Sequence, residues 1–275
     1  MGIDVNRRVL PGFRLSLAYT LVYMSLLVLI PLAACFLKAS SLTFDQFWAT
    51  VWTARARAAY GLTFGASLMA AVADVCVGVV VAWVLVRYRF PFKRVFDALI
   101  DLPLALPTAV VGLVYSSLYV KTGWLGRFLV PLGIQAAYSR LAIVLVLTFI
   151  GLPFVVRAVQ PVMEDFETEQ EEAAACLGAS RTQTYWRVIL PTMYPAIVTG
   201  FALAFARALG EYGSVVFVSG NMPFKTEIAP VLIVARLEEF AYAEATAIAV
   251  VLLLISFTML VLINLLERWS KVNGH

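Results

Sequence analysis

The stretch EDFETEQEEAAACLGASRTQTYWRVILP, from Glu164 to Pro191, is the only long polar interval in a sequence that is 62% hydrophobic. Two pairs in it, Thr168 with Glu171 and Ser180 with Gln183, have the spacing of capping boxes. In a capping box, a hydroxyl at a helix start and a side chain three residues later satisfy each other's backbone donors. The stretch therefore predicts two short helices.

A glycine and a proline mark where these two helices should end. Gly178 suits the left-handed backbone that closes many helices, and Pro191 lacks the backbone N–H that would continue the second one. The second helix places Trp186, Ile189 and Leu190 on one side, so it can lie against a membrane or a partner. The pattern indicates a helix–glycine–helix element suited to docking.

The remainder of the chain has the composition of a membrane protein. Its mean hydropathy is +0.88 over 275 residues, and its net charge of +4 is mild. Basic residues in a chain of this composition more often orient membrane spans than bind nucleic acid, so we expect membrane lipid and not nucleic acid as a partner. The three cysteines have neither metal-ligand spacing nor a placement that suits a disulfide. We expect an all-α, polytopic chain with one membrane domain, residues 1–275.

Six apolar segments are long enough to cross a bilayer of roughly 30 Å as helices. The basic cluster from Arg87 to Arg94 should remain in the cytoplasm, which places both termini and the docking interval there as well. Residues 226–240 are read as a short outer-face helix, because their apolar part is too short to span. The predicted spans are 15–37, 61–86, 99–120, 141–159, 195–219 and 243–266, with a cytoplasmic loop over 161–194.

Two N-terminal patterns offer alternatives to a first span. Arg7-Arg8 resembles a twin-arginine signal, and Leu32-Ala33-Ala34-Cys35 resembles a lipoprotein cleavage box. The apolar run is longer than a secretory signal needs, and further spans follow it. We therefore expect the first span to be retained.

Enzymatic chemistry finds little support in the sequence. There is no GxxxxGK[ST] loop to cradle phosphates, so ATP hydrolysis would have to come from another subunit. The only histidine, His275, is the last residue, and no HExxH or GxSxG motif is present. We expect no catalytic residue, no metal site and no cofactor bound by this chain.

Three ionisable residues fall inside predicted spans, where charges are costly enough to indicate function. Asp74 and Arg207 should lie near the membrane midplane, and Glu211 one helical turn beyond Arg207. One interpretation is a structural ion-pair network between helices. The other is a translocation path in which Arg207 attracts an anion while Glu211 or Asp74 keeps its binding weak. Gly210 and Gly213 are interpreted as packing positions.

The segment DLPLALPT, from Asp101 to Thr108, opens the third predicted span. Pro103 and Pro107 remove backbone donors and favour a bent or unwound entrance. Asp101 is interpreted as an acid at a helix N-terminus. The two prolines are candidate hinge residues.

The docking stretch resembles the EAA motif of permease subunits in ABC importers. Glu172-Ala173-Ala174 is followed at the motif's spacing by Gly178, Val188 and Leu190-Pro191, with valine in place of the usual isoleucine. The resemblance implies the six-helix, type I (MetI-like) transmembrane domain and a loop that docks on an ATP-binding subunit. The implied coupling residues are Glu171, Glu172, Ala173, Ala174, Gly178, Ala179, Leu190 and Pro191.

Further motifs resemble the T-type permease branch of the sulfate/thiosulfate importers. They are RVLPGF at 8–13, RYRFP at 87–91, DALIDLPLALPTAVVGL at 97–113, IGLPFVVRAVQPV at 150–162 and LGEYGSVVFVSGN at 209–221. This resemblance implies a second, W-type permease, a dimer of ATP-binding subunits that use ATP and Mg, and a periplasmic sulfate-binding protein. The bacterial inner membrane is the implied location.

Three alternatives remain open at this point. A molybdate or tungstate permease would share the architecture, since no spacing in the sequence selects sulfate. An ion-driven secondary transporter would use Asp74 and Glu211 as coupling carboxylates. A purely structural membrane scaffold would transport nothing.

Overall fold

A computed structural model describes residues 13–273, and within that range the chain forms helices and no strand. The Arg7-Arg8 pair and His275 lie outside the described residues. The helices are α1 (Phe13–Met24), η1 (Ser25–Leu29), α2 (Ile30–Ala39), α3 (Phe44–Val51), α4 (Ala54–Arg87), α5 (Lys93–Ile100), α6 (Leu102–Ala105), α7 (Thr108–Tyr119), α8 (Gly126–Leu129), η2 (Val130–Leu132), α9 (Arg140–Glu164), α10 (Thr168–Cys176), α11 (Arg181–Thr184), η3 (Tyr185–Ile189), α12 (Leu190–Leu209), α13 (Val215–Val218), α14 (Ala229–Glu238) and α15 (Tyr242–Asn273).

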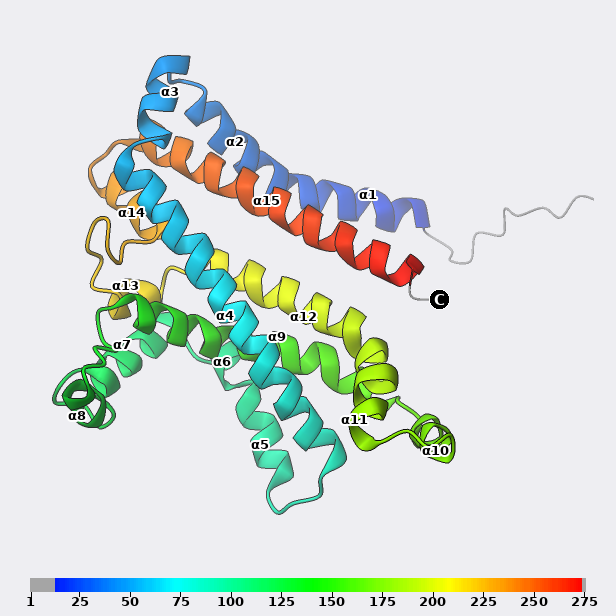
Figure 1. Ribbon diagram of the computed structural model, residues 1–275. Coiled ribbons are helices and arrows are strands. Elements are labelled where there is room, and N and C mark those ends of the chain that lie inside the picture. The colour runs from blue at the N-terminus through cyan, green and yellow to red at the C-terminus, as the bar shows by residue number, and fades with distance from the viewer. Residues whose placement is uncertain (1–12, 274–275) are drawn as a thin grey trace, which may run out of the picture.

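The core lies where α4, α9 and α12 pack against one another (Figure 1). Two glycines allow this close approach. A Cβ on Gly78 would lie 2.8 Å from Cγ1 of Val155, and one on Gly200 would lie 2.9 Å from Cα of the same valine. Small residues at helix crossings let backbones approach in a membrane, where van der Waals packing replaces the hydrophobic effect as the driving force.

Five helices in the described chain are long and apolar enough to cross a membrane. They cover Leu15–Ala39, Ala54–Arg87, Arg140–Glu164, Arg181–Leu209 and Tyr242–Leu265, and Thr108–Tyr119 is a shorter apolar helix. Each predicted apolar segment thus has a helical counterpart. Two of the predicted boundaries, however, need correction.

The third predicted span, 99–120, is divided among α5, α6 and α7. Leu106 and Pro107 have extended backbones, with ψ of 138° and 129°, so the chain is unwound just before α7. Pro103 is buried within α6, and Pro107 is the N-cap of α7. The predicted unwound entrance is confirmed at Pro107, because a residue before proline avoids helical geometry.

The fifth predicted span, 195–219, begins earlier and ends earlier than expected. Pro191 does not end a helix, since one continuous helix runs from Arg181 to Leu209. It passes through the π-helical segment η3, in which the N–H of Leu190 bonds to the carbonyl of Tyr185. The helix then ends at Gly210, so the second helix of the docking interval and the fifth span form one rod.

Both π-helical segments stand immediately before a proline. The segment η1 precedes Ile30-Pro31, and η3 precedes Leu190-Pro191. In an α-helix, the proline ring collides with the carbonyl four residues earlier, and that carbonyl loses its donor. The wider π turn moves this carbonyl aside. A π turn therefore lets each helix continue through its proline.

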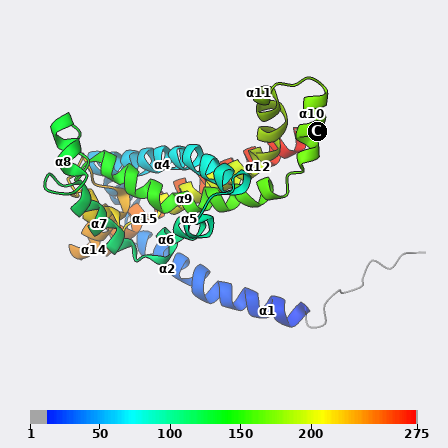
Figure 2. The same ribbon diagram turned by 90° about the horizontal axis from the view of Figure 1, so that it is seen from below.

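The two ends of the molecule carry different elements (Figures 1 and 2). In both views, α8 lies at one end and the α10–α11 pair at the other. The start of α1 and the C-terminal end of α15 lie at the α10–α11 end in Figure 1. The short helix predicted within 226–240 is present as α14, at the end opposite α10 (Figure 1).

Candidate functional site

Helix α10 ends in the glycine cap that the sequence predicts. Gly178 has a φ of +82°. Its N–H bonds to the carbonyl of Ala175 at 2.9 Å, and the N–H of Ala179 bonds to the carbonyl of Ala174 at 3.0 Å. This pair of bonds is the Schellman motif, and it needs a residue that tolerates the left-handed region at the position of Gly178.

One of the two predicted capping boxes is confirmed, and the other is wrong. Ser180 and Gln183 satisfy each other's backbone donors at the start of α11. At the start of α10, Glu167 is the N-cap, without a side-chain bond, and Thr168 is already helical. Glu171 does not reach back to Thr168, because its carboxylate is paired with Arg87 at the end of α4.

The docking element presents most of its surface to the outside. No side chain of α10 is buried, Glu172 and Ala173 are exposed, and Leu177 beside the cap is 89% exposed. Farther along, Leu190 is half-buried and Pro191 is exposed. A side chain as apolar as leucine gains free energy when a partner covers it. This surface has the form of a docking site.

The structure brings Arg207 and Glu211 together, although Glu211 lies beyond the end of α12. Nη1 of Arg207 is 2.6 Å from Oε2 of Glu211. The other carboxylate oxygen of Glu211 accepts from the backbone N–H and the hydroxyl of Ser214, each at 2.9 Å. Glu211 is thus held on both sides and is 3% exposed, whereas Arg207 is 33% exposed.

Asp74 lies apart from this pair. It is 1% exposed in the middle of α4, and its Oδ1 has no hydrogen-bond partner among the described residues. A Cβ on Gly151 of α9 would lie 2.0 Å from Oδ2 of Asp74 and 3.4 Å from Cβ of Ala204 in α12. Asp74 therefore occupies the crossing of three helices, and the predicted ion-pair network does not include it.

The segment after α12 is packed closely against α7. A Cβ on Gly213 would lie 2.2 Å from Oγ1 of Thr108, and one on Gly112 would lie 2.3 Å from the carbonyl oxygen of Ser214. The hydroxyl of Ser116 donates to the carbonyl of Phe217 at 2.7 Å. The packing role predicted for Gly213 is confirmed, while a Cβ on Gly210, at the helix end, would have nothing within 4 Å. The Glu211 region is thereby fixed to the helix that follows Pro107.

Sequence reasoning missed a second charged cluster, centred on Arg157 of α9. Its guanidinium donates to Asp101 at 2.9 and 2.6 Å and to Asp97 at 2.7 Å. Asp101 is therefore an ion-pair partner and makes no side-chain cap at the start of α6. The cluster ties α5 and α6 to α9. The sequence offers one signal of this cluster: Asp97 and Asp101 stand four residues apart, and Arg157 is a charge near the end of another predicted span.

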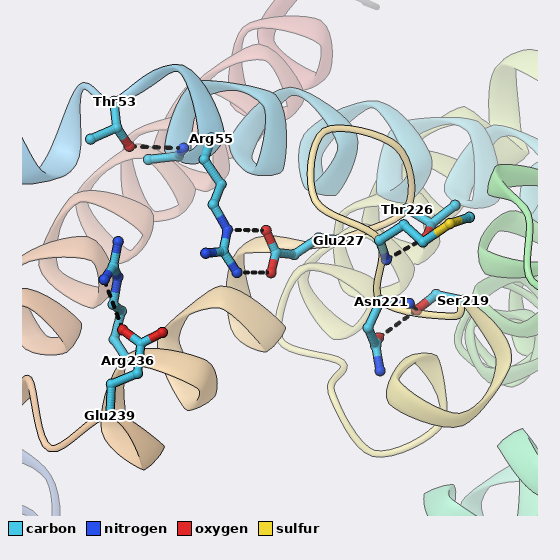
Figure 3. A network of polar contacts seen from close by, with 10 residues as sticks. Thr53, Arg55, Ser219, Asn221, Thr226, Glu227, Arg236 and Glu239 are labelled. Carbon is cyan, nitrogen blue, oxygen red and sulfur yellow. Dashed lines mark hydrogen bonds and ion pairs between the residues drawn. The ribbon is translucent and has the colours of Figure 1, made fainter.

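A third charged contact, drawn in Figure 3, lies at the start of α4, at the end opposite α10 in Figure 1. Arg55 of α4 donates to both carboxylate oxygens of Glu227, at 2.8 and 2.7 Å. Nearby, the hydroxyl of Thr226 accepts from the N–H of Met222, and Asn221 pairs with Ser219. A bidentate pair of this kind fixes orientation as well as distance. It holds the loop between α13 and α14 against the start of α4.

The docking element and the intramembrane charges both lie in a part of the chain that a known family shares. A family described as "Binding-protein-dependent transport system inner membrane component" matches residues 74–272, which include α10, Asp74, Arg207 and Glu211. The chain belongs to this family. It is accordingly a multi-pass inner-membrane component of a transport system, and its described helices agree with that location.

Curated relatives of this inner-membrane component are similar over almost their whole length. The "Sulfate transport system permease protein CysT" of Synechocystis sp. is 50% identical over 252 residues, 92% of this chain and 88% of the relative. The protein of that name from Synechococcus elongatus is 51% identical over 260 residues, 94% of each chain. That from Escherichia coli is 44% identical over 272 residues, 98% of each chain.

Solved structures show that the inner-membrane component has the fold of ABC importer transmembrane subunits. A chain of the bacterial alginate ABC transporter in complex with its alginate pentasaccharide-bound periplasmic protein has a TM-score of 0.77 at 16% identity, over 94% of this chain and 95% of that one. The MetNI methionine ABC transporter in an inward-facing conformation gives a TM-score of 0.53 at 17% identity, over 84% of this chain and 99% of that one. At these identities the likeness concerns the fold alone.

Proposed function

We propose that this chain is the membrane-spanning permease subunit of an ATP-driven importer of sulfate and thiosulfate. One observation carries this proposal: relatives named as sulfate transport permeases are 44–51% identical to the chain and match it nearly from end to end. These relatives give no support to a molybdate or tungstate permease. The chain would form half of the pore.

In this proposal, the element from α10 to η3 docks on an ATP-binding subunit. The Gly178 cap and the exposed Glu172 and Leu177 give it a defined, uncovered surface. The subunit would be present as a dimer and would hydrolyse ATP with Mg, so this chain would need no cofactor. Both termini would lie on the cytoplasmic side of the membrane, as would α10.

We assign the anion path to Arg207. Its side chain is one-third exposed near the end of α12, and a guanidinium offers five N–H donors to an oxyanion. Glu211 orients Arg207, because both of its own oxygens are already engaged. Asp74 is buried away from the pair, so it would occupy the helix crossing and contact no substrate in this conformation.

The remaining parts of the transporter follow from the family. The other half of the pore would be a W-type permease, and a periplasmic sulfate-binding protein would deliver the anion. The unwound chain at Pro107 would act as a hinge, with Pro103 held in the bundle beside it. Much of the anion selectivity would then belong to the binding protein.

The test is uptake of radiolabelled sulfate in proteoliposomes that hold the chain with its partner permease, ATPase and binding protein. Uptake should require every component and be inhibited by unlabelled thiosulfate. Gly178→Asp should abolish uptake while assembly persists, because it strains the cap and adds charge to the docking surface. Uptake without the ATPase would instead favour a secondary transporter.

A further inference from the structure

The last turn of α4 is where three separate parts of the chain meet. Arg87 is the final residue of α4, and its guanidinium forms an ion pair with Glu171 of α10. The same guanidinium lies 5.3 Å from the ring centroid of Trp83 and 5.8 Å from that of Phe166. A cation held against a carboxylate and over two aromatic faces is restrained in several directions.

Helix α10 also lies against α11 and η3, but it buries no side chain there. It has no buried side chain, and only Glu171 and Ala174 are half-buried. A cavity of about 380 Å³ lies beside it, lined by Glu171 together with Trp83, Tyr185 and Ile189. Arg87 and Glu171 are 21% and 31% exposed, so their ion pair is better shielded from water than a surface pair. This ion pair therefore ties α10 directly to the end of α4.

One turn earlier, α4 also contacts the rod that leads to Arg207. The ring of Trp83 packs edge-on against Tyr185 of η3, with centroids 5.7 Å apart. Residue Tyr185 belongs to the continuous helix from Arg181 to Leu209. The last turn of α4 thus reaches α10 through Arg87 and the rod through Trp83.

We propose that the Arg87–Glu171 ion pair is a clasp that transmits movement of α10 to α4. The inference rests on the proposed function, in which an ATPase moves α10. With the clasp closed, α4 follows α10, and its packing against α9 and α12 carries the motion into the membrane core. With the clasp open, only the rod follows. Glu171 is then a positioning residue, and Glu172 is left to face the ATPase.

The first test measures sulfate transported per ATP hydrolysed in the reconstituted complex. Glu171→Gln and Arg87→Gln should each lower this ratio on the order of three- to tenfold while the subunits still assemble. The double reversal Arg87→Glu with Glu171→Arg should recover part of the ratio, which loss of structure alone would not allow. Arg89→Gln is the matched control: Arg89 is exposed and makes no ion pair with the described residues. An unchanged ratio in Glu171→Gln, or a double reversal no better than the singles, would overturn the clasp.

A second test is independent of the transported anion. Cys76 of α4 and Cys176 of α10 are both exposed and can carry spin labels in a Cys35→Ser background. The distance distribution between the labels in lipid should be narrow in that background and broader after Glu171→Gln. A distribution that Glu171→Gln leaves unchanged refutes the clasp. Failure of the labelled transporter to take up sulfate, with the broadening present, would refute only the proposed substrate.

Discussion

Gly151 has no room for a side chain, because the carboxyl group of Asp74 fills the space in front of it. A Cβ there would lie 2.0 Å from Oδ2 of Asp74. We expect Gly151→Ala to lower the free energy of unfolding by about 1–3 kcal/mol, the usual cost of overpacking a core. The melting temperature of the purified chain in detergent measures this effect.

Two variants sharpen this measurement. Gly65→Ala is the control, since a Cβ on Gly65 has nothing within 4 Å. Asp74→Ala should relieve the collision, so Gly151→Ala should cost less in an Asp74→Ala background. If Gly151→Ala and Gly65→Ala melt at the same temperature, Asp74 does not lie against Gly151.

Arg207 and Glu211 differ in exposure, and this difference predicts different phenotypes. Arg207→Gln should depress sulfate uptake at least about tenfold with assembly retained, because it removes the charge-assisted contact to the anion that we propose for Arg207. Glu211→Gln should also lower the thermal stability, because the buried carboxylate of Glu211 forms an ion pair with Arg207 and accepts two hydrogen bonds from Ser214. Uptake counts and co-purification with the partner subunits separate the two effects. Loss of assembly in Arg207→Gln would support a purely structural role.

At the scale of elements, the Arg157 cluster decides whether α5 and α6 stay on the bundle. Arg157→Gln should speed amide hydrogen exchange over 93–105, because the ion pairs to Asp97 and Asp101 hold these short helices to α9. Exchange in the middle of α9 should change little. Arg94→Gln is the control, as Arg94 is exposed on the same segment. Equal exchange in both variants would mean that apolar packing alone holds α5.

Local features of the chain could be predicted from the sequence more reliably than long-range ones. The Gly178 cap and the Ser180–Gln183 box depend on a few neighbouring residues, and both are present. The prediction that Pro191 ends a helix is wrong, because a π turn upstream lets the helix continue through it. Glu171 was assigned to a local cap, yet its partner Arg87 is 84 positions away. Spacing along the chain carries no information about such a pair.

At the scale of the whole molecule, the arrangement predicts a definite topology. If the five long helices and the divided segment 93–119 each cross the membrane once, both ends of the described chain lie on the same side as α10. A green fluorescent protein fused to the C-terminal end should fluoresce, and alkaline phosphatase fused there should be inactive. Phosphatase inserted after Phe224 should be active. The reverse pattern would contradict the orientation drawn from the basic cluster at Arg87 to Arg94.

The first helix of the chain has a surface that the rest of the chain does not cover. In the first helix, Leu15–Ala39, none of the most apolar part is buried within the described chain. In the helix Arg140–Glu164, just over half of the most apolar part is buried. The helix therefore contacts its neighbours weakly and offers its surface to lipid or to another subunit. Hydropathy predicted this helix well, because a membrane solvates an apolar surface whichever neighbour covers it.

The unbroken helix from Arg181 to Leu209 has a mechanical consequence. At 1.5 Å per residue it is a lever about 40 Å long, with the docking element at one end and Arg207 near the other. A tilt of roughly 5° about one end of the helix would displace its other end by about 3.5 Å. No loop interrupts this lever, and the π turn of η3 together with Pro191 and Pro195 marks where it can bend. In the proposed function, a movement of the docking element would reach Arg207 through this one helix, reduced by any bend at η3.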